Sequence, residues 1–519
     1  MHDRARRQIA WHSCLQPTQG KSELTCGFLT KSRDTEQTIS TLNTIHLSDT
    51  TQASSPDSCS SLHLSTCISV RLLPSSSWLF SHRQRLSTRV ECPTFNLNRS
   101  KPACQSLLSE ADPVDRENVG AYYDAKFYAT SPDFASSTPG DVLKKELVHP
   151  GFGRLHSISR SVWRFQYTSL DANDSLVPSS GIIMFPRTSM PDIPLGDQRN
   201  VLPLVAYAHG TIGQHYGCAP SSGMHFFEQE NLEPLLAEGY TVVATDYAGL
   251  GNNYTSHKYL SFAAHANDIY YSVVAARKMF PIVFNDKWMS IGHSQGGGAV
   301  WKLAEHPLVQ DPRSGYVGTV SIAPAVNMSD LATTTYEKIL PLPNYQDYSV
   351  TGLSALLLTG IKAAYPEYQM PWAADALQNM LHFTNITQSC AVAITTLATN
   401  LRIEQIIAPG AATPTNDDIL KQWTRQHAAA QGDPASMPML LIQGLEDTAV
   451  LPECTIRAYE SATRLNTIGL LEYSGLNHTA VIAASAPRWL QFMKDRFSDH
   501  PTDFETSRVT FDANSTIAR

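Results

Sequence analysis

Ser294 stands in a pattern that can do nucleophilic chemistry, Gly292-His293-Ser294-Gln295-Gly296. A short, mostly apolar run, Lys287–Ile291, precedes it, and a helix-forming stretch begins at Gln295. A strand, a sharp turn and a helix in this order lift a serine hydroxyl clear of the backbone, and the two glycines leave room for the turn. We therefore predict that Ser294 is a nucleophile. The residues alone also allow a glycine-rich turn without a catalytic role.

A base and an acid follow later in the chain. His478 comes after the predicted strand Ile468–Tyr473, and Asp447 comes after the predicted strand Met437–Gly444. A carboxylate in this place can fix the tautomer of the histidine and stabilise the imidazolium. Glu446 is the neighbouring rival for that role. The chain order Ser, Asp, His is the one expected of an α/β-hydrolase.

A glycine loop upstream supplies a candidate oxyanion site. His209–Gly213 ends the apolar run Val201–Ala208, which we interpret as a buried central strand. In this architecture such a loop gives one backbone N–H, and the residue after the nucleophile gives the other. We assign Thr211 and Gln295, although the loop donor could be any residue from Thr211 to Gly213. His209 is interpreted as a structural residue.

The surrounding elements predict one α/β fold with a mainly parallel central sheet, helices on both faces and an inserted helical lid. An alternating strand, Ser161–Tyr167, and its hairpin partner, Gly181–Pro186, begin the orderly part. We expect the lid to line an apolar pocket, with Leu356 or Leu357 facing it. The predicted division is 1–111, a low-order Ser/Thr-rich region; 112–325, the first part of the core; 326–436, the lid; 437–500, the second part of the core; and 501–519, a tail.

The first 110 residues differ in composition from the rest. They hold 32 serines and threonines and six of the nine cysteines, without a periodic apolar pattern. No signal peptide is evident at the start, and no apolar run is long enough to span a membrane. Candidate glycosylation sites nevertheless favour an extracellular protein. They are Asn173, Asn253, Asn327, Asn385 and Asn514.

Charge and motifs exclude several other classes of function. A net charge of −8 argues against a nucleic-acid partner. The chain has no His-Glu-x-x-His and no Cys-x-x-Cys, so we expect neither a metal nor a cofactor. The sequence gives no indication of the oligomeric state.

Several of these motifs together resemble the fungal secretory lipase family, an α/β-hydrolase family. The resemblance covers about Asp112 to His500 and rests on His209-Gly210-Thr211, Cys218-Ala219-Pro220-Ser221, Asp246-Tyr247-x-Gly249-Leu250-Gly251, Gly292–Gly297 and Gly444–Val450. It implies an extracellular serine esterase acting on acylglycerols and other carboxylic esters, with a disulfide between Cys218 and Cys390. A second family disulfide uses a cysteine just before the catalytic histidine, where this chain has Leu476 and Asn477. Cys454 is therefore left without an obvious partner.

The sequence thus predicts a secreted triacylglycerol lipase with an ester substrate, which contacts a lipid interface through its lid. One alternative is an esterase that deacetylates a bulky secondary metabolite with the same three residues. A peptidase and a non-catalytic binding module are further alternatives, because neither the triad nor the fold fixes the substrate.

Overall fold

The computed structural model covers residues 1–519, and its chain separates into two units, 1–78 and 79–519. The structure describes residues 24–28, 41–45, 84–85, 101–120, 122–148, 155–187, 201–223, 226–411, 413–498 and 501–512. In the first unit, β1 (Leu24–Phe28) pairs antiparallel with β2 (Thr41–Ile45). Most of the predicted low-order region lies outside the described residues.

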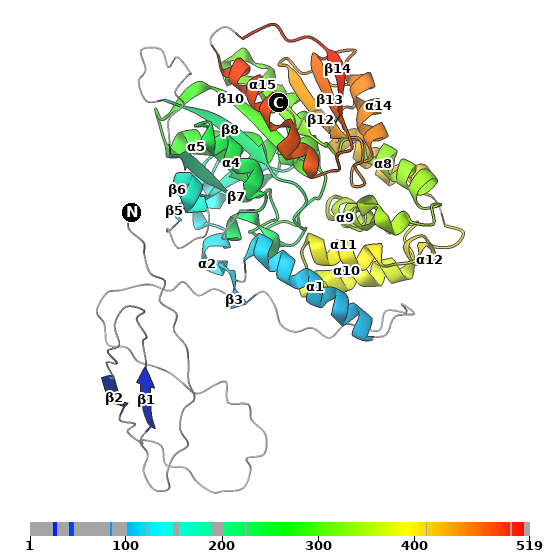
Figure 1. Ribbon diagram of the computed structural model, residues 1–519, viewed down its shortest axis with the longest axis horizontal. Coiled ribbons are helices and arrows are strands. Elements are labelled where there is room, and N and C mark those ends of the chain that lie inside the picture. Colours follow the sequence, from blue (N-terminus) through cyan, green and yellow to red (C-terminus); the bar gives the residue numbers. More distant parts are fainter. Residues whose placement is uncertain are drawn as a thin grey trace, which may run out of the picture. The chain divides into compact units, whose positions relative to one another are not determined.

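A ten-stranded sheet forms the centre of the second unit (Figure 1). Its order is β14-β13-β12-β11-β10-β8-β9-β7-β6-β5. The bounds are β5 Val142–Leu147, β6 Ser159–Leu170, β7 Leu176–Pro186, β8 Leu202–Ala208, β9 Thr241–Thr245, β10 Phe284–His293, β11 Tyr316–Ile322, β12 Met439–Gly444, β13 Ile468–Ser474 and β14 Ser507–Asp512. All neighbours from β9 to β14 are parallel, whereas β5, β6 and β7 are antiparallel. The predicted hairpin is β6 and β7.

Helices cover both faces of this sheet, as the alternation of strand and helix predicted. Leu204 and Ala206 of β8 pack in one apolar cluster with α5 (Phe262–Met279) and α6 (Gln295–Ala304). Their neighbour Val205 points the other way, into a second cluster with residues of two further helices. These are α4 (Gln229–Ala237) and α15 (Ala480–Phe497). A strand buried on both faces needs apolar residues at successive positions, which explains the continuous apolar runs.

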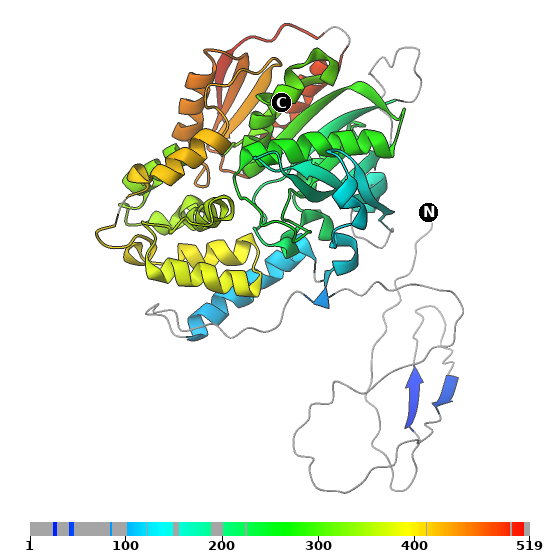
Figure 2. The ribbon, with the colours of Figure 1, turned by 180° about the vertical axis from the view of Figure 1, so that it is seen from behind.

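The insertion between β11 and β12 is helical, and its helices gather beside the sheet in both views (Figures 1 and 2). It contains α8 Met328–Thr334, α9 Ser349–Ala364, α10 Asp375–Thr387, α11 Ala391–Thr399, α12 Ile403–Ile406 and α13 Asp418–His427. We call this segment the lid. The remaining helices are α1 Lys101–Val119, α2 Ala125–Tyr128, α3 Leu155–Ile158, α7 Pro307–Gln310 and α14 Pro452–Ala462.

Both ends of the predicted core need correction. The helix α1 begins at Lys101, inside the predicted low-order region, and lies along α11 of the lid (Figure 1). Its packed face alternates the partly buried Leu107 and Leu108 with Cys104, Ala111 and Asp115, so the apolar stripe is short and interrupted by small and polar residues. At the other end, β14 lies in the predicted tail and pairs with β13. It is an edge strand whose side chains are mostly exposed, so its sequence has no apolar run.

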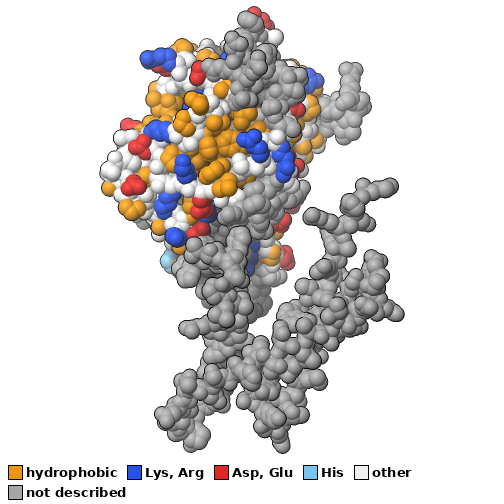
Figure 3. Space-filling view, turned by 90° about the vertical axis from the view of Figure 1, so that its left-hand side faces the viewer, with side chains coloured by type: hydrophobic (Ala, Val, Ile, Leu, Met, Phe, Trp, Pro, Cys, Tyr) orange, Lys and Arg blue, Asp and Glu red, His pale blue; other side chains and the backbone are white. Residues whose placement is uncertain are grey.

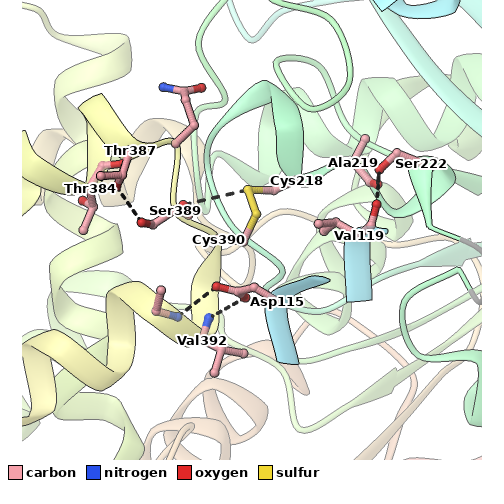
Figure 4. The surroundings of a disulfide bond; sticks show 12 residues. Asp115, Val119, Cys218, Ala219, Ser222, Thr384, Thr387, Ser389, Cys390 and Val392 are labelled. Carbon is pink, nitrogen blue, oxygen red and sulfur yellow. Dashed lines mark hydrogen bonds between the residues drawn. A yellow bond between two sulfur atoms is a disulfide. The ribbon is translucent and has the colours of Figure 1, made fainter. Parts of the chain in front are cut away.

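One disulfide ties the lid to the core, and it is the predicted one, between Cys218 and Cys390 (Figure 4). Beside it, the carboxylate of Asp115 accepts hydrogen bonds from Val392 N at 3.1 Å and Ala393 N at 3.0 Å, at the start of α11. Burial raises the pKa of Asp115 to about 6, although these two N–H groups lower it. Among the described cysteines, Cys454 is free and buried, and burial raises the pKa of its thiol to about 12.

The surface of the described part mixes apolar and charged areas. On the face shown in Figure 3, hydrophobic side chains gather in one area, with lysines, arginines and carboxylates around them. In the part of the chain that the structure describes, no helix combines the length and the apolar character needed to cross a bilayer.

Candidate active site

Ser294 sits on a strained turn between β10 and α6. Its backbone has φ 58° and ψ −117°, a region that L-residues rarely adopt. The turn is held by hydrogen bonds from Ser294 N to Ile322 O at 2.9 Å and from Ala325 N to Ser294 O at 3.2 Å. A Cβ on Gly296 would lie 1.9 Å from the carbonyl oxygen of Ala208. The glycine is therefore required by the close approach of the first turn of α6 to β8.

The predicted base and acid meet at the same edge of the sheet. His478 Nδ1 lies 2.7 Å from Asp447 Oδ2, and Asp447 has no exposed side-chain surface. The other carboxylate oxygen, Oδ1, accepts hydrogen bonds from Ala449 N at 2.8 Å and Val450 N at 2.9 Å. Glu446 is exposed and is not the partner of His478. The arrangement leaves Nε2 of His478 as the nitrogen that can take a proton.

Ser294, Asp447 and His478 lie at the same edge of the sheet, because each follows the carboxyl end of a parallel strand, β10, β12 or β13. The ring of His293, directly before Ser294, has its centroid 4.5 Å from that of His478. Its Nε2 lies 3.1 Å from the backbone oxygen of His478. The turn that carries Ser294 is thus hydrogen-bonded to the loop that carries His478.

The loop His209–Gly213 is held from several sides. Gly210 N donates to Glu228 Oε2 at 3.0 Å, and Ala391 N, from the lid, donates to Ile212 O at 2.9 Å. The hydroxyl of Thr211 lies 2.7 Å from that of Tyr259. We call residues 209–213 the oxyanion loop, after the role predicted for it. His209 has the structural place expected, with Nδ1 2.7 Å from Gly210 O.

Gln295 begins α6, so its backbone N–H has no partner within the helix. Its side chain is buried, with Nε2 at 3.3 Å from His257 Nε2 and at 3.1 Å from His265 Nε2. Burial lowers the pKa of His257 to about 3 and lowers that of His265 well below its usual value. Both rings are therefore neutral, and each can accept a hydrogen bond from the Gln295 amide.

A mostly apolar pocket of about 740 Å³ opens at Ser294. Core and lid both line it, through Tyr259, Leu260, Ser294, Ala325, Met328, Leu331, Ala332, Thr335, Tyr336, Leu340, Val350, Thr351, Leu353, Ser354, Leu357, Trp372, Ile406, Ile407, Pro414, Ala449 and Val450. Of the two lid leucines considered from the sequence, Leu357 lines the pocket and Leu356 does not, although both belong to the main apolar cluster. The pocket has the mostly apolar lining of a small-molecule site.

Comparison with known proteins assigns this chain to a family. The family model described as "Secretory lipase" matches residues 224–504, which is more than half of the chain. The chain belongs to the secretory lipase family. Among curated proteins, no sequence match was found.

Solved structures with the α/β-hydrolase fold are similar to the structure of this chain. Two structures of Candida antarctica lipase A, one in its closed state, match with a TM-score of 0.57 at 14% and 15% identity. Each match covers 75% of this chain and 91% of the other. The rice cell wall degrading esterase LipA from Xanthomonas oryzae matches with a TM-score of 0.52 at 17% identity, over 70% of this chain and 97% of the other. At these identities the likeness shows the fold alone.

Proposed function

We propose that this protein hydrolyses carboxylic esters, with Ser294 as nucleophile, His478 as general base and acid, and Asp447 as the group that orients the histidine. The observation that carries the proposal is the 2.7 Å contact between His478 Nδ1 and Asp447 Oδ2, at the same sheet edge as a serine on a strained turn. Family membership supports an ester substrate.

The mechanism follows from the positions of the protons. His478 Nε2 takes the proton of Ser294 Oγ while Oγ attacks the ester carbonyl carbon, and the imidazolium keeps its Nδ1–H on Asp447. The carbonyl oxygen becomes an oxyanion, which the backbone N–H groups of Gln295 and Thr211 stabilise. His478 then protonates the leaving alcohol as the C–O bond breaks. Water attacks the acyl-enzyme in the same way and releases the acid.

The pocket supports a substrate with an apolar acyl chain, and therefore a lipase. Most of its lining side chains are apolar, and many of them come from the lid. Each methylene buried there would contribute about 0.8 kcal/mol to transition-state binding until the pocket is full. A preference for acetate esters would instead favour the alternative, deacetylation of a secondary metabolite.

Action outside the cell is part of the proposal. The Cys218–Cys390 disulfide is typical of an oxidising compartment, and the family is described as secretory. Asn173, Asn253 and Asn385 are exposed and could carry glycans. Asn327 is only partly exposed, and its Oδ1 accepts a hydrogen bond from Asp330 N at the start of α8.

The test is Ser294→Ala, assayed on a p-nitrophenyl octanoate ester. We expect kcat to fall by about 10⁴-fold or more, because the attacking oxygen is lost while the fold is kept. The matched control is Ser461→Ala, at an exposed position near the end of α14, and it should keep full activity. A Ser294→Ala protein that is folded and retains a tenth of the wild-type kcat would rule out the proposed mechanism.

A further inference from the structure

Glu228 is a largely buried carboxylate in a backbone conformation that its residue type rarely adopts. It precedes α4 with φ 64° and ψ 36°, and its side chain is 11% exposed. Such a conformation persists only where the surroundings hold it, and it often marks a functional position. Glu228 has no place in the catalytic mechanism described above.

Three groups from different parts of the site meet on this carboxylate. Oε2 accepts hydrogen bonds from Tyr207 OH at 2.6 Å and from Gly210 N at 3.0 Å, while Oε1 lies 3.1 Å from His293 Nδ1. A Cβ on Gly210 would lie 2.5 Å from Oε1, so the carboxylate rests directly against the oxyanion loop. The backbone N–H group that the carboxylate holds belongs to Gly210, the residue before Thr211.

His293 extends this network to the base. Its two ring nitrogens face two acceptors, Glu228 Oε1 at 3.1 Å and the backbone oxygen of His478 at 3.1 Å. Burial alone would raise the pKa of Glu228, but His293, Tyr207 and the Gly210 N–H outweigh it and hold that pKa below its usual value. The ring of His293 thus bridges the Glu228 carboxylate and the backbone of His478.

We propose that Glu228 is a positioning residue: it fixes the oxyanion loop through Gly210 N and, through His293, fixes the backbone of His478. This inference rests on the proposed function of Ser294 and His478. It explains how the oxyanion loop and the loop that carries His478, which follow different strands, keep fixed positions relative to each other. The hydrogen bonds to Glu228 and His293 thus supplement the backbone contacts within each loop.

Two variants of Glu228 differ in the hydrogen bonds that they can keep, and they therefore test the proposed role. In Glu228→Gln the amide oxygen can keep Tyr207 OH and Gly210 N, while the amide NH₂ donates to His293 Nδ1. A neutral histidine protonated on Nε2 accepts at Nδ1, so this ring can still donate to His478 O. Glu228→Gln therefore keeps every bond, whereas Glu228→Leu, of similar size, keeps none.

The experiment measures kcat and KM on p-nitrophenyl octanoate, normalised to the sites labelled by an alkyl fluorophosphonate, which reacts with an activated serine. For Glu228→Leu we expect kcat per labelled site to fall by about 10²-fold with KM within about threefold, because an oxyanion donor acts mainly in the transition state. Glu228→Gln should stay within about fivefold of wild type. Glu230→Leu, at an exposed position in the first turn of α4, is the matched control and should leave both constants unchanged.

Three results would overturn the proposal. They are equal losses in Glu228→Leu and Glu228→Gln, a rise in KM at unchanged kcat, and a normal kcat per labelled site with only the labelled fraction reduced. If Glu228→Leu does not fold, His293→Phe replaces it, since it keeps the ring and removes the link to His478 O. There we expect a loss of about tenfold in kcat per labelled site, and an unchanged kcat would refute the coupling. A wild-type protein that neither reacts with the probe nor cleaves the ester would instead refute the proposed function, and this inference with it.

Discussion

Asp447→Asn should disable the enzyme by forcing the wrong tautomer of His478. In the wild type, Oδ1 accepts from Ala449 N at 2.8 Å and Val450 N at 2.9 Å, while Oδ2 faces His478 Nδ1 at 2.7 Å. An asparagine has one acceptor oxygen, and the two backbone N–H groups hold it at the Oδ1 position. Its NH₂ then points at Nδ1 of the histidine, which must accept, so the ring proton moves to Nε2.

A histidine protonated on Nε2 cannot take the proton of Ser294. We expect kcat to fall by about 10⁴-fold, which corresponds to about 5.5 kcal/mol at about 1.36 kcal/mol for each factor of ten. The fold should survive, because Gln443 Nε2 donates to Asp447 Oδ2 at 3.1 Å but also to Gly444 O at 3.0 Å. Loss of one such bond costs about 1 kcal/mol.

The assay compares Asp447→Asn with Glu446→Gln on a p-nitrophenyl ester, with thermal unfolding of both proteins as the check on the fold. Glu446 is exposed, so Glu446→Gln should stay close to wild type. A folded Asp447→Asn protein with kcat within tenfold of wild type would refute the tautomer argument. A larger loss in Glu446→Gln than in Asp447→Asn would assign the carboxylate role to Glu446.

Two further predictions concern the apolar pocket and Asp115, whose carboxylate accepts hydrogen bonds from the start of α11. The ratio kcat/KM should rise from acetate to octanoate esters by up to about fourfold per methylene. Leu357→Asp should flatten that rise, because Leu357 lines the pocket. An unchanged slope in the variant would show that the acyl chain of the substrate binds elsewhere. Asp115 has its pKa raised from 3.8 to about 6 in the folded state, so its contribution to stability is complete below about pH 3.8 and is lost as the pH rises through 6. Asp115→Asn should therefore destabilise the protein more at pH 4 than at pH 7.5, by up to about 3 kcal/mol in denaturant unfolding, and a pH-independent difference would contradict this assignment.

The sequence predicted those parts of the fold that repeat a local pattern. Buried parallel strands such as β8 and β12 carry continuous apolar runs, and the turn at Ser294 carries its glycines, so their types could be read locally. The edge strand β14 and the helix α1 carry weaker patterns, because one needs little apolar surface and the other buries mostly small and polar residues beside two leucines. Both were missed for that reason.

For the candidate site, the sequence pointed to Ser294, Asp447 and His478, and their catalytic roles stay predictions. It could not point to Glu228, because a hydrogen bond between residues 65 positions apart depends on the tertiary fold. His293 was visible as the middle residue of the glycine pattern, but its double contact with a carboxylate and a carbonyl was not. A buried glutamate with positive φ leaves no mark in a single sequence.

The disulfide between Cys218 and Cys390 divides the three proposed catalytic residues in an uneven way. It closes a covalent ring with a sequence separation of 172, and this ring contains Ser294 while Asp447 and His478 lie outside it. A protease that cuts the chain once anywhere inside the ring opens a peptide bond but releases no fragment, because both new ends stay attached through the sulfur bridge. A single cut between Cys390 and Asp447 leaves Ser294 and His478, the proposed nucleophile and base, on separate chains. A cut in the lid before Cys390 thus keeps all three residues covalently joined, whereas a cut after Cys390 does not.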